Sequence, residues 1–158
     1  MGYNLSSWGD VFVYHSSTSQ LQDLGRLGRE SDAHCMNNAG EIAGFYFDTS
    51  SSGGFLYSKG SFRALGAIYH RGINDNGDVV GDVGMHASVL YHGQSTVQDL
   101  NTIVADPTWS LQIASGINNS GQICGYGVHY GFQFRGFLIT PVFHPFFLAQ
   151  PAKGISGK

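Results

Sequence analysis

The sequence predicts an all-β protein built from repeated four-stranded units, and three observations support this fold class. Glycine accounts for 23 of the 158 residues and aromatic residues for 13%, whereas charged residues reach only 12%, about half the usual share. The apolar runs are short and are bounded by Gly, Asn and Ser, which is typical of strands joined by tight turns. The third observation is an internal repeat that covers most of the chain.

The repeat contains an asparagine, a glycine three residues later and a second glycine four residues after that. It occurs in AHCMNNAGEIAGFYF (33–47), HRGINDNGDVVGDVG (70–84) and ASGINNSGQICGYGV (114–128). An Asn side chain can bond its own backbone two residues on, and Gly takes the positive φ that other residues resist. We expect each Asn–Gly pair to form an equivalent hairpin corner. The aligned residues are Asn37, Asn74 and Asn118, then Gly40, Gly77 and Gly121, then Gly44, Gly81 and Gly125.

A second module follows each corner and supplies two more strands. It reads GFLYSKGSFRALG (54–66), SVLYHGQSTVQDLN (88–101) and, as a partial copy, GFLITP (136–141); the chain also opens with it, as VFVYHSSTSQLQDLG (11–25). Four short strands in about 40 residues is the size of a β-propeller blade. A β-solenoid is the main alternative. Counted in this way, the chain holds fourteen strands, or three and a half blades.

We therefore expect a single repeat domain at 1–141 and a C-terminal tail at 142–158. The domain divides into a partial blade at 2–28, blades at 29–66 and 67–109, and a partial blade at 110–141. An open arc would leave unpaired sheet edges, which soluble proteins avoid. Either the segment VFHPFF (142–147) closes a four-bladed ring, or two chains pair into a ring of seven or eight blades. The homodimer is the favoured prediction.

Composition also excludes several classes of function. The net charge is −3 and the eight basic residues are scattered, so we expect no nucleic-acid partner. We expect no membrane partner, because no apolar stretch is long enough to span a bilayer, and the N-terminus lacks the pattern of a signal peptide. Cys35 and Cys124 lie far apart in the sequence and form no CxxC motif for zinc. Whether they form a disulfide is left open. Cys124 aligns with Ala43 and Val80, so we expect it to be buried.

The middle corner raises the question of a metal site. It carries Asp75 and Asp78, whereas the other corners have Asn and Glu or Asn and Gln at these positions. Calcium prefers six to eight oxygen ligands, and one short hairpin offers too few. The turn interpretation is favoured, and calcium held by Asp75 and Asp78 is the alternative.

Two further groups of residues are candidates for a site. His86 and His129 both follow the strand after a corner and could share one rim as general base or metal ligand, the alternative being scattered loop residues. Trp8 and Trp109 fall in loops and do not recur, so either could stack on a sugar or other flat ligand. The alternative for Trp109 is a surface residue that packs against the neighbouring blade.

The motifs LQDLGRLGRESDAHCMNNAGEIAG and VQDLN…ASGINNSGQICGYG…RGFLITP resemble the HAF family of probable extracellular repeats. The resemblance covers about Gly2 to Pro141 and looks like the C-terminal half of a longer repeat protein. It implies a propeller in a bacterial protein that is extracellular or periplasmic, with no agreed catalytic residues. The chain departs from the family in its degenerate His-Ala-Phe element, present as His86-Ala87-Ser88, and in lacking an export signal, which leaves export open.

These observations favour a non-catalytic binding or structural module that recognises a glycan, a small molecule or another extracellular partner, because no catalytic set recurs between copies. The first alternative is a calcium-assisted hydrolase of lactones or esters, with Asp75 and Asp78 on the metal and His86 and His129 activating water. The second is an inactive half-propeller fragment. No cofactor is required by the sequence, and calcium is the one considered.

Overall fold

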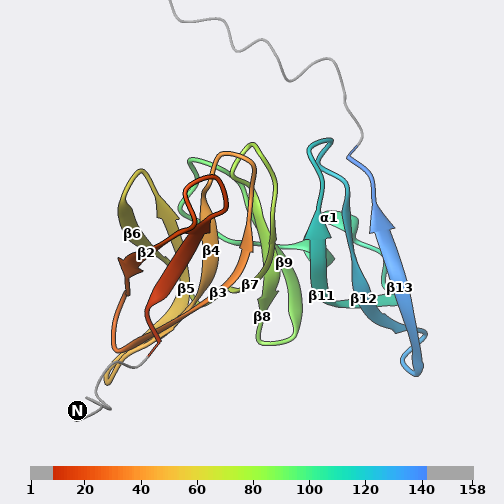
Figure 1. The fold of residues 1–158 in the computed structure, drawn as a ribbon. Coiled ribbons are helices and arrows are strands. Elements are labelled where there is room, and N and C mark those ends of the chain that lie inside the picture. Colours follow the sequence, from red (N-terminus) through yellow and green to blue (C-terminus); the bar gives the residue numbers. More distant parts are fainter. Residues whose placement is uncertain (1–8, 142–158) are drawn as a thin grey trace, which may run out of the picture.

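The computed structural model describes residues 9–141, and these form four antiparallel sheets that lie side by side in a row (Figure 1). The prediction of an all-β protein is confirmed. Thirteen strands lie in the described range, and the predicted strand near Gly2 lies outside it. The strands are β1 (Val11–His15) and β2 (Gln20–Gly25) in the first sheet; β3 (Glu30–Met36), β4 (Ile42–Phe47), β5 (Ser52–Ser58) and β6 (Ser61–Gly66) in the second; β7 (Tyr69–Ile73), β8 (Val79–Val83), β9 (His86–Leu90) and β10 (Gln98–Asp99) in the third; and β11 (Trp109–Ile117), β12 (Ile123–His129) and β13 (Gln133–Ile139) in the fourth.

Within each sheet the strands follow chain order, so every sheet is a simple antiparallel meander. In the last three sheets the first strand is β3, β7 or β11, and we call these the lead strands. Each lead strand ends at an Asn–Gly corner and pairs with the strand after it. Neighbouring lead strands also contact each other, β3 with β7 and β7 with β11.

Three apolar layers hold the four sheets together. Because successive side chains of a strand point to opposite faces, one strand can serve two layers. In β4, Ile42 packs toward the first sheet with Phe55, whereas Ala43 packs toward the third sheet with Val79. The layer between the third and fourth sheets contains Val80, Ala87, Val89, Leu100, Leu111, Ala114 and Ile123. The core is therefore divided among sheet interfaces.

The strand register corrects the alignment of the second module. Gly44 pairs with Phe55, Gly81 with Ser88, and Gly125 with Phe137. These pairs make Phe55, Ser88 and Phe137 equivalent, so the copies at 54–66 and 88–101 are offset by one residue from an alignment that matches Gly54 with Ser88. The distinction matters because a one-residue slip turns every side chain to the opposite face of a sheet.

The third sheet ends differently from the prediction, which extended a strand through VQDLN. Strand β10 has only two residues and leads into a short helix, α1 (Leu100–Val104). Asp99 caps this helix by accepting a hydrogen bond from the Asn101 backbone N–H at 2.8 Å. The Asn101 side chain then binds both backbone groups of Leu111, and Leu100 is buried. After Asp99 the helix cap and the contacts of Asn101 therefore stabilise a helical turn in place of a longer fourth strand.

Candidate functional site

The three Asn–Gly corners have the same geometry. In the first, Asn37 Oδ1 accepts hydrogen bonds from the backbone N–H groups of Ala39 and Glu41 at 3.1 and 3.0 Å. Asn74 and Asn118 repeat both bonds with the residues two and four positions on. The closing glycines have φ values of 77°, 81° and 73°, a region that an L-residue occupies only with strain. The turn interpretation therefore accounts for all three copies.

Side-chain hydrogen bonds join the corners into a ladder. Asn37 Nδ2 donates to the backbone oxygen of Asn74 at 3.0 Å, and Asn74 Nδ2 donates to that of Asn118 at 3.3 Å. Asp75 lies between the outer two corners and accepts from both Asn38 and Asn119. These bonds, led by that from the Asn38 side chain, lower the pKa of Asp75 below its usual value.

The same contacts bear on the predicted calcium ligands. The Asp75 carboxylate accepts three N–H donors, and Asp78 accepts the Asn74 side chain and the His92 backbone N–H, each at 2.9 Å. Among residues 9–141, no group of three or more His, Cys, Asp or Glu side chains is arranged to hold a metal ion. Calcium at Asp75 and Asp78 stays a prediction.

The structure places the two predicted histidines in separate clusters. Both lie at the hairpin that joins the second and third strands of a sheet: His86 is the first residue of β9, and His129 is the last residue of β12. His86 Nδ1 lies 2.9 Å from Asp99 Oδ2. Burial alone would raise the pKa of Asp99, but hydrogen bonds from His86 and Asn101 outweigh it and lower the pKa.

His129 lies instead beside Trp109. Their rings stack at 4.7 Å and 29°, and the ring of Tyr130 follows at 4.1 Å from His129. Trp109 is half-buried against the layer between the third and fourth sheets, so one ring both packs internally and forms part of a surface cluster. Trp8 lies outside the described residues.

The cysteines are both free thiols. Burial raises the pKa of Cys35 to about 11, so it is not activated as a nucleophile. The prediction that Cys124 is buried is wrong, because Cys124 is exposed. Ala43 and Val80 are covered by the sheet that follows them, and no described sheet follows Cys124.

A feature that sequence reasoning missed is a β-bulge at the same position of each lead strand. The pairing skips one residue between Ala33 and Cys35, and likewise in β7 and β11. Each bulge lies opposite the second glycine of the repeat, where the two backbones approach closely: a Cβ on Gly44 would collide with the backbone oxygen of Asp32. Bulges redirect a side chain. The three redirected residues are His34, Arg71 and Ser115.

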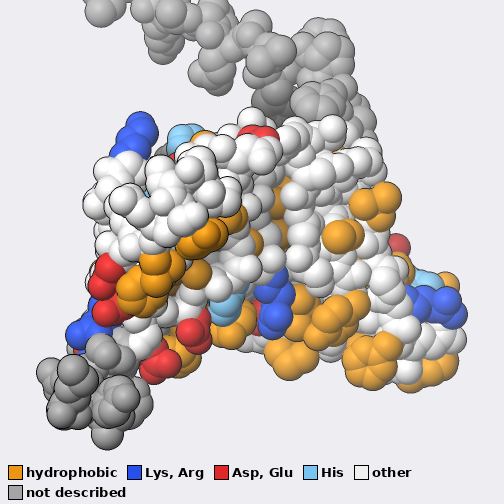
Figure 2. Space-filling model, viewed as in Figure 1, with side chains coloured by type: hydrophobic (Ala, Val, Ile, Leu, Met, Phe, Trp, Pro, Cys, Tyr) orange, Lys and Arg blue, Asp and Glu red, His pale blue; other side chains and the backbone are white. Residues whose placement is uncertain are grey.

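These three bulge residues line one open groove of about 520 Å³, which we call the bulge groove. Its other lining residues are Ala33, Tyr69 and His70. All three bulge side chains are exposed. Figure 2 shows a histidine and a basic side chain close together over β3 and β7, among hydrophobic side chains. The groove therefore presents different polar groups from three equivalent positions.

The ring of Tyr69 organises the middle of the groove. The Arg71 Cζ lies 5.1 Å from its centroid, and the rings of His34 and Phe45 lie 5.0 and 4.9 Å away. Arg71 Nε also donates to Asp82 Oδ1 at 3.1 Å. This arrangement combines a cation, an aromatic ring and hydrogen-bonding groups, which suits binding.

Beneath the groove, His70 is a structural residue. It is fully buried, and its Nδ1 lies 3.0 Å from the backbone oxygen of Gly44 in the second sheet. Burial lowers the pKa of His70 to about 4, against 6.5 ordinarily. Its backbone oxygen in turn lies 2.8 Å from Nδ1 of His34. His70 thus joins the second and third sheets and supports a bulge residue.

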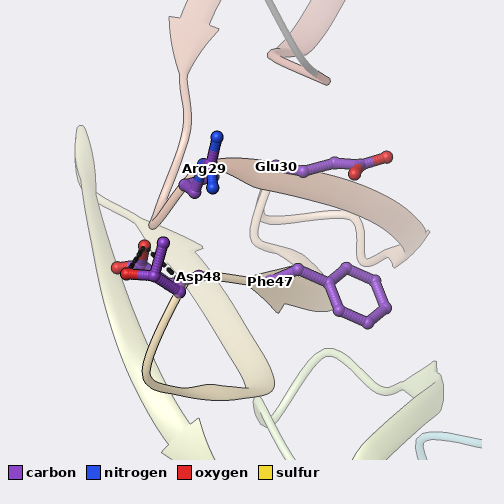
Figure 3. A pocket seen from close by; sticks show the side chains of 5 residues that line it. Arg29, Glu30, Phe47 and Asp48 are labelled. Atoms are coloured by element: carbon purple, nitrogen blue, oxygen red, sulfur yellow. Dashed lines mark hydrogen bonds between the residues drawn. The ribbon is translucent and has the colours of Figure 1, made fainter.

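A second pocket, of about 270 Å³, lies at the rim of the second sheet (Figure 3). Glu30 and Phe47 extend together away from Arg29 and Asp48. Asp48 Oδ1 accepts the backbone N–H of Thr49 at 2.7 Å. Its residues come from the ends of β3 and β4 and the loops beside them, all in one copy, so the pocket is not built from equivalent positions as the bulge groove is.

Comparisons with protein-family models, with curated proteins and with solved structures found no match for this chain. Among residues 9–141 there is no helix of the length and apolar character that crossing a membrane requires. The contacts of the bulge groove are thus the main basis for inferring function.

Proposed function

We propose that this chain is a non-catalytic, propeller-type binding module, of the kind the HAF resemblance implies, and that its bulge groove recognises an extracellular or periplasmic glycan. One observation carries the proposal. The corners repeat the same asparagine and glycine in all three copies, whereas the bulge positions hold His34, Arg71 and Ser115, and all three line one groove. A repeated scaffold that presents varied side chains is an arrangement suited to recognition.

Antiparallel meanders in a row, two of them four-stranded, with adjacent lead strands, support the propeller-type arrangement. In a propeller the first strand of each blade lies nearest the central channel. The bulge groove would then lie at the channel, where residues from several blades meet. This position explains why side chains so far apart in the sequence could contact one ligand.

The groove chemistry favours an acidic sugar. Tyr69 is 36% exposed and offers a ring for a sugar to stack on. Arg71 uses Nε for Asp82, and a guanidinium has five N–H donors that match a carboxylate. Because the whole chain carries a net charge of −3, attraction for an anion arises locally at Arg71.

A glycan array of neutral and uronic-acid oligosaccharides, followed by calorimetry, tests the proposal. We expect a uronic-acid ligand to bind and Arg71→Ser to weaken it about 10- to 100-fold, the range for a charge-assisted hydrogen bond. Tyr69→Leu should weaken binding while sparing the charge. Arg29→Ser, in the rim pocket, is the matched control. Absence of glycan binding, or equal affinity of Arg71→Ser and wild type, would contradict the proposal.

One observation favours a hydrolase as the second candidate. The Asp99 carboxylate holds His86 Nδ1 at 2.9 Å, which is how a general-base imidazole is oriented. Ser88 is buried and donates to the His86 backbone oxygen, so water rather than Ser88 would be the nucleophile. Turnover of a lactone and ester panel that is lost in His86→Gln would support this candidate. Turnover that is unchanged in that variant would rule out His86 as the general base.

A further inference from the structure

The outward face of the fourth sheet is exposed where its counterparts are buried. Leu56 and Val89 are 5% and 0% exposed, because the following sheet covers them, whereas the equivalent Leu138 is 66% exposed. Cys124 lies directly opposite Leu138 across β12 and β13 and is exposed too. With Tyr126 and Phe134, which share this face by register, these side chains form what we call the trailing face.

The first sheet shows the converse. Its inward side chain Val11 is buried, but Phe12 is 50% exposed, whereas Phe55, at the same position of the next copy, is fully buried against the preceding sheet. Tyr14 and Leu21 pair across β1 and β2 on the same side as Phe12 and are also exposed. Phe12, Tyr14 and Leu21 form the leading face.

The two faces cannot meet within one copy. The first and fourth sheets lie at opposite ends of the row, β2 at the left and β13 at the right of Figure 1. Each face nevertheless carries apolar side chains at the positions that are buried at the internal sheet interfaces. Every internal sheet interface joins the trailing side of one sheet to the leading side of the next.

We propose that the trailing face of one copy docks on the leading face of a second copy, and that two copies close head to tail into one ring. The six large side chains of the two faces expose on the order of 700 Å² per copy. A single contact would bury too little for a stable dimer. Closure uses both faces of both copies and buries about 1,400 Å², within the range of stable interfaces. Heterologous faces of this kind form rings when the rotation closes.

Sedimentation velocity of the full chain across a concentration series tests this inference. We expect wild type to sediment as a dimer. A trailing-face variant (Phe134→Ser with Leu138→Ser) and a leading-face variant (Phe12→Ser with Tyr14→Ser) should each be monomers, with dissociation constants raised at least about 100-fold. Phe132→Ser is the control, because Phe132 is 75% exposed but belongs to the β12–β13 turn. Circular dichroism of each variant checks that it is folded.

Mixing the two double variants distinguishes head-to-tail docking from pairing of like faces. Each mixture partner retains one intact face, so the mixture should regain one contact and associate weakly at the highest concentrations, where neither variant associates alone. If like faces pair, one of the variants will dimerise by itself, and the inference is wrong. A wild-type monomer at all concentrations, or a dimer that persists in both variants, would also overturn it. Dimers that depend on the two faces but bind no glycan would leave the inference standing.

Discussion

The corners and the bulges lie only a few residues apart on the same lead strands, yet they differ in how they vary between copies. Asn37, Asn74 and Asn118 are identical and bond one another, so each corner fixes the position of its neighbour. The bulge residues His34 and Arg71 differ although their backbone geometry is the same. The comparison separates the corner residues, which hold neighbouring sheets together and are the same in all copies, from the bulge residues, which can change in one copy without changing the others.

The largest effect should come from a substitution at the glycine that faces a bulge. In Gly81→Ala the new Cβ would collide with the backbone oxygen of Tyr69, and strand backbone cannot yield cheaply. We expect a loss of about 3 kcal/mol in the free energy of unfolding, measured by urea denaturation. Gly136→Ala is the control, because its Cβ would meet only the Gly125 oxygen at 3.7 Å. Equal losses in the two variants would contradict the close-packing account of the bulge.

The second effect concerns the residue that precedes the middle bulge. This position is Ala33 and Ala114 in the other copies but His70 in the third sheet. Below about pH 6.5 the unfolded chain protonates this histidine, whereas the folded protein keeps it neutral until about pH 4. Its depressed pKa therefore makes stability fall as the pH drops through this window, by about 2–3 kcal/mol.

Urea denaturation of wild type and His70→Ala between pH 7.5 and 4.5 measures this difference. The variant starts less stable because it leaves a cavity, but its stability should fall more gently with acid. Parallel curves for the two proteins would show that His70 does not titrate as its burial requires.

A third, smaller effect distinguishes corners inside the ladder from the one at its end. Asn74 is 3% exposed, and its loss leaves two part-buried backbone N–H groups, those of Asn76 and Asp78, without their acceptor. We expect Asn74→Ala to cost about 2 kcal/mol. Asn118→Ala removes equivalent bonds at an exposed corner, where water replaces them, and should cost about half as much. Thermal unfolding of both variants gives the comparison, and equal costs would mean that the ladder adds nothing.

The sequence was sufficient to predict the all-β class and the corners, because Asn–Gly turns depend on residues within five positions of Asn37, Asn74 and Asn118. The sequence also places Asp99, a residue type favoured at helix N-caps, directly before Leu100, although the short helix that follows was not predicted. The bulges were not predicted, because a bulge is a property of the register between two strands.

A signal for the bulge residues was nevertheless present. The position of Arg71 holds a different residue in each copy, whereas the asparagine and the two glycines that follow it recur in all three, and this contrast could have pointed to the groove. The exposure of Cys124 could not be read from its alignment with Ala43 and Val80. Burial at that position depends on whether another sheet follows, which the residue's own neighbours do not reveal.

The smallest effect on stability should accompany the largest effect on binding. Arg71→Ser places in the third sheet the residue that the fourth sheet already carries at Ser115. The side chain is exposed and its ion pair with Asp82 lies at the surface, so we expect less than about 0.5 kcal/mol of lost stability. Differential scanning calorimetry checks this. A loss as large as that of Asn74→Ala would make Arg71 part of the scaffold and end the contrast between corners and bulges.

Amide chemical-shift mapping with a uronic-acid oligosaccharide tests the assignment of recognition to the bulges most directly. We predict that the largest shifts fall on His34, Arg71 and Ser115 and on Tyr69 beside them, while the corner amides of Asn37, Asn74 and Asn118 stay unchanged. Shifts centred on Trp109, His129 and Tyr130, or spread along the corners, would contradict the account.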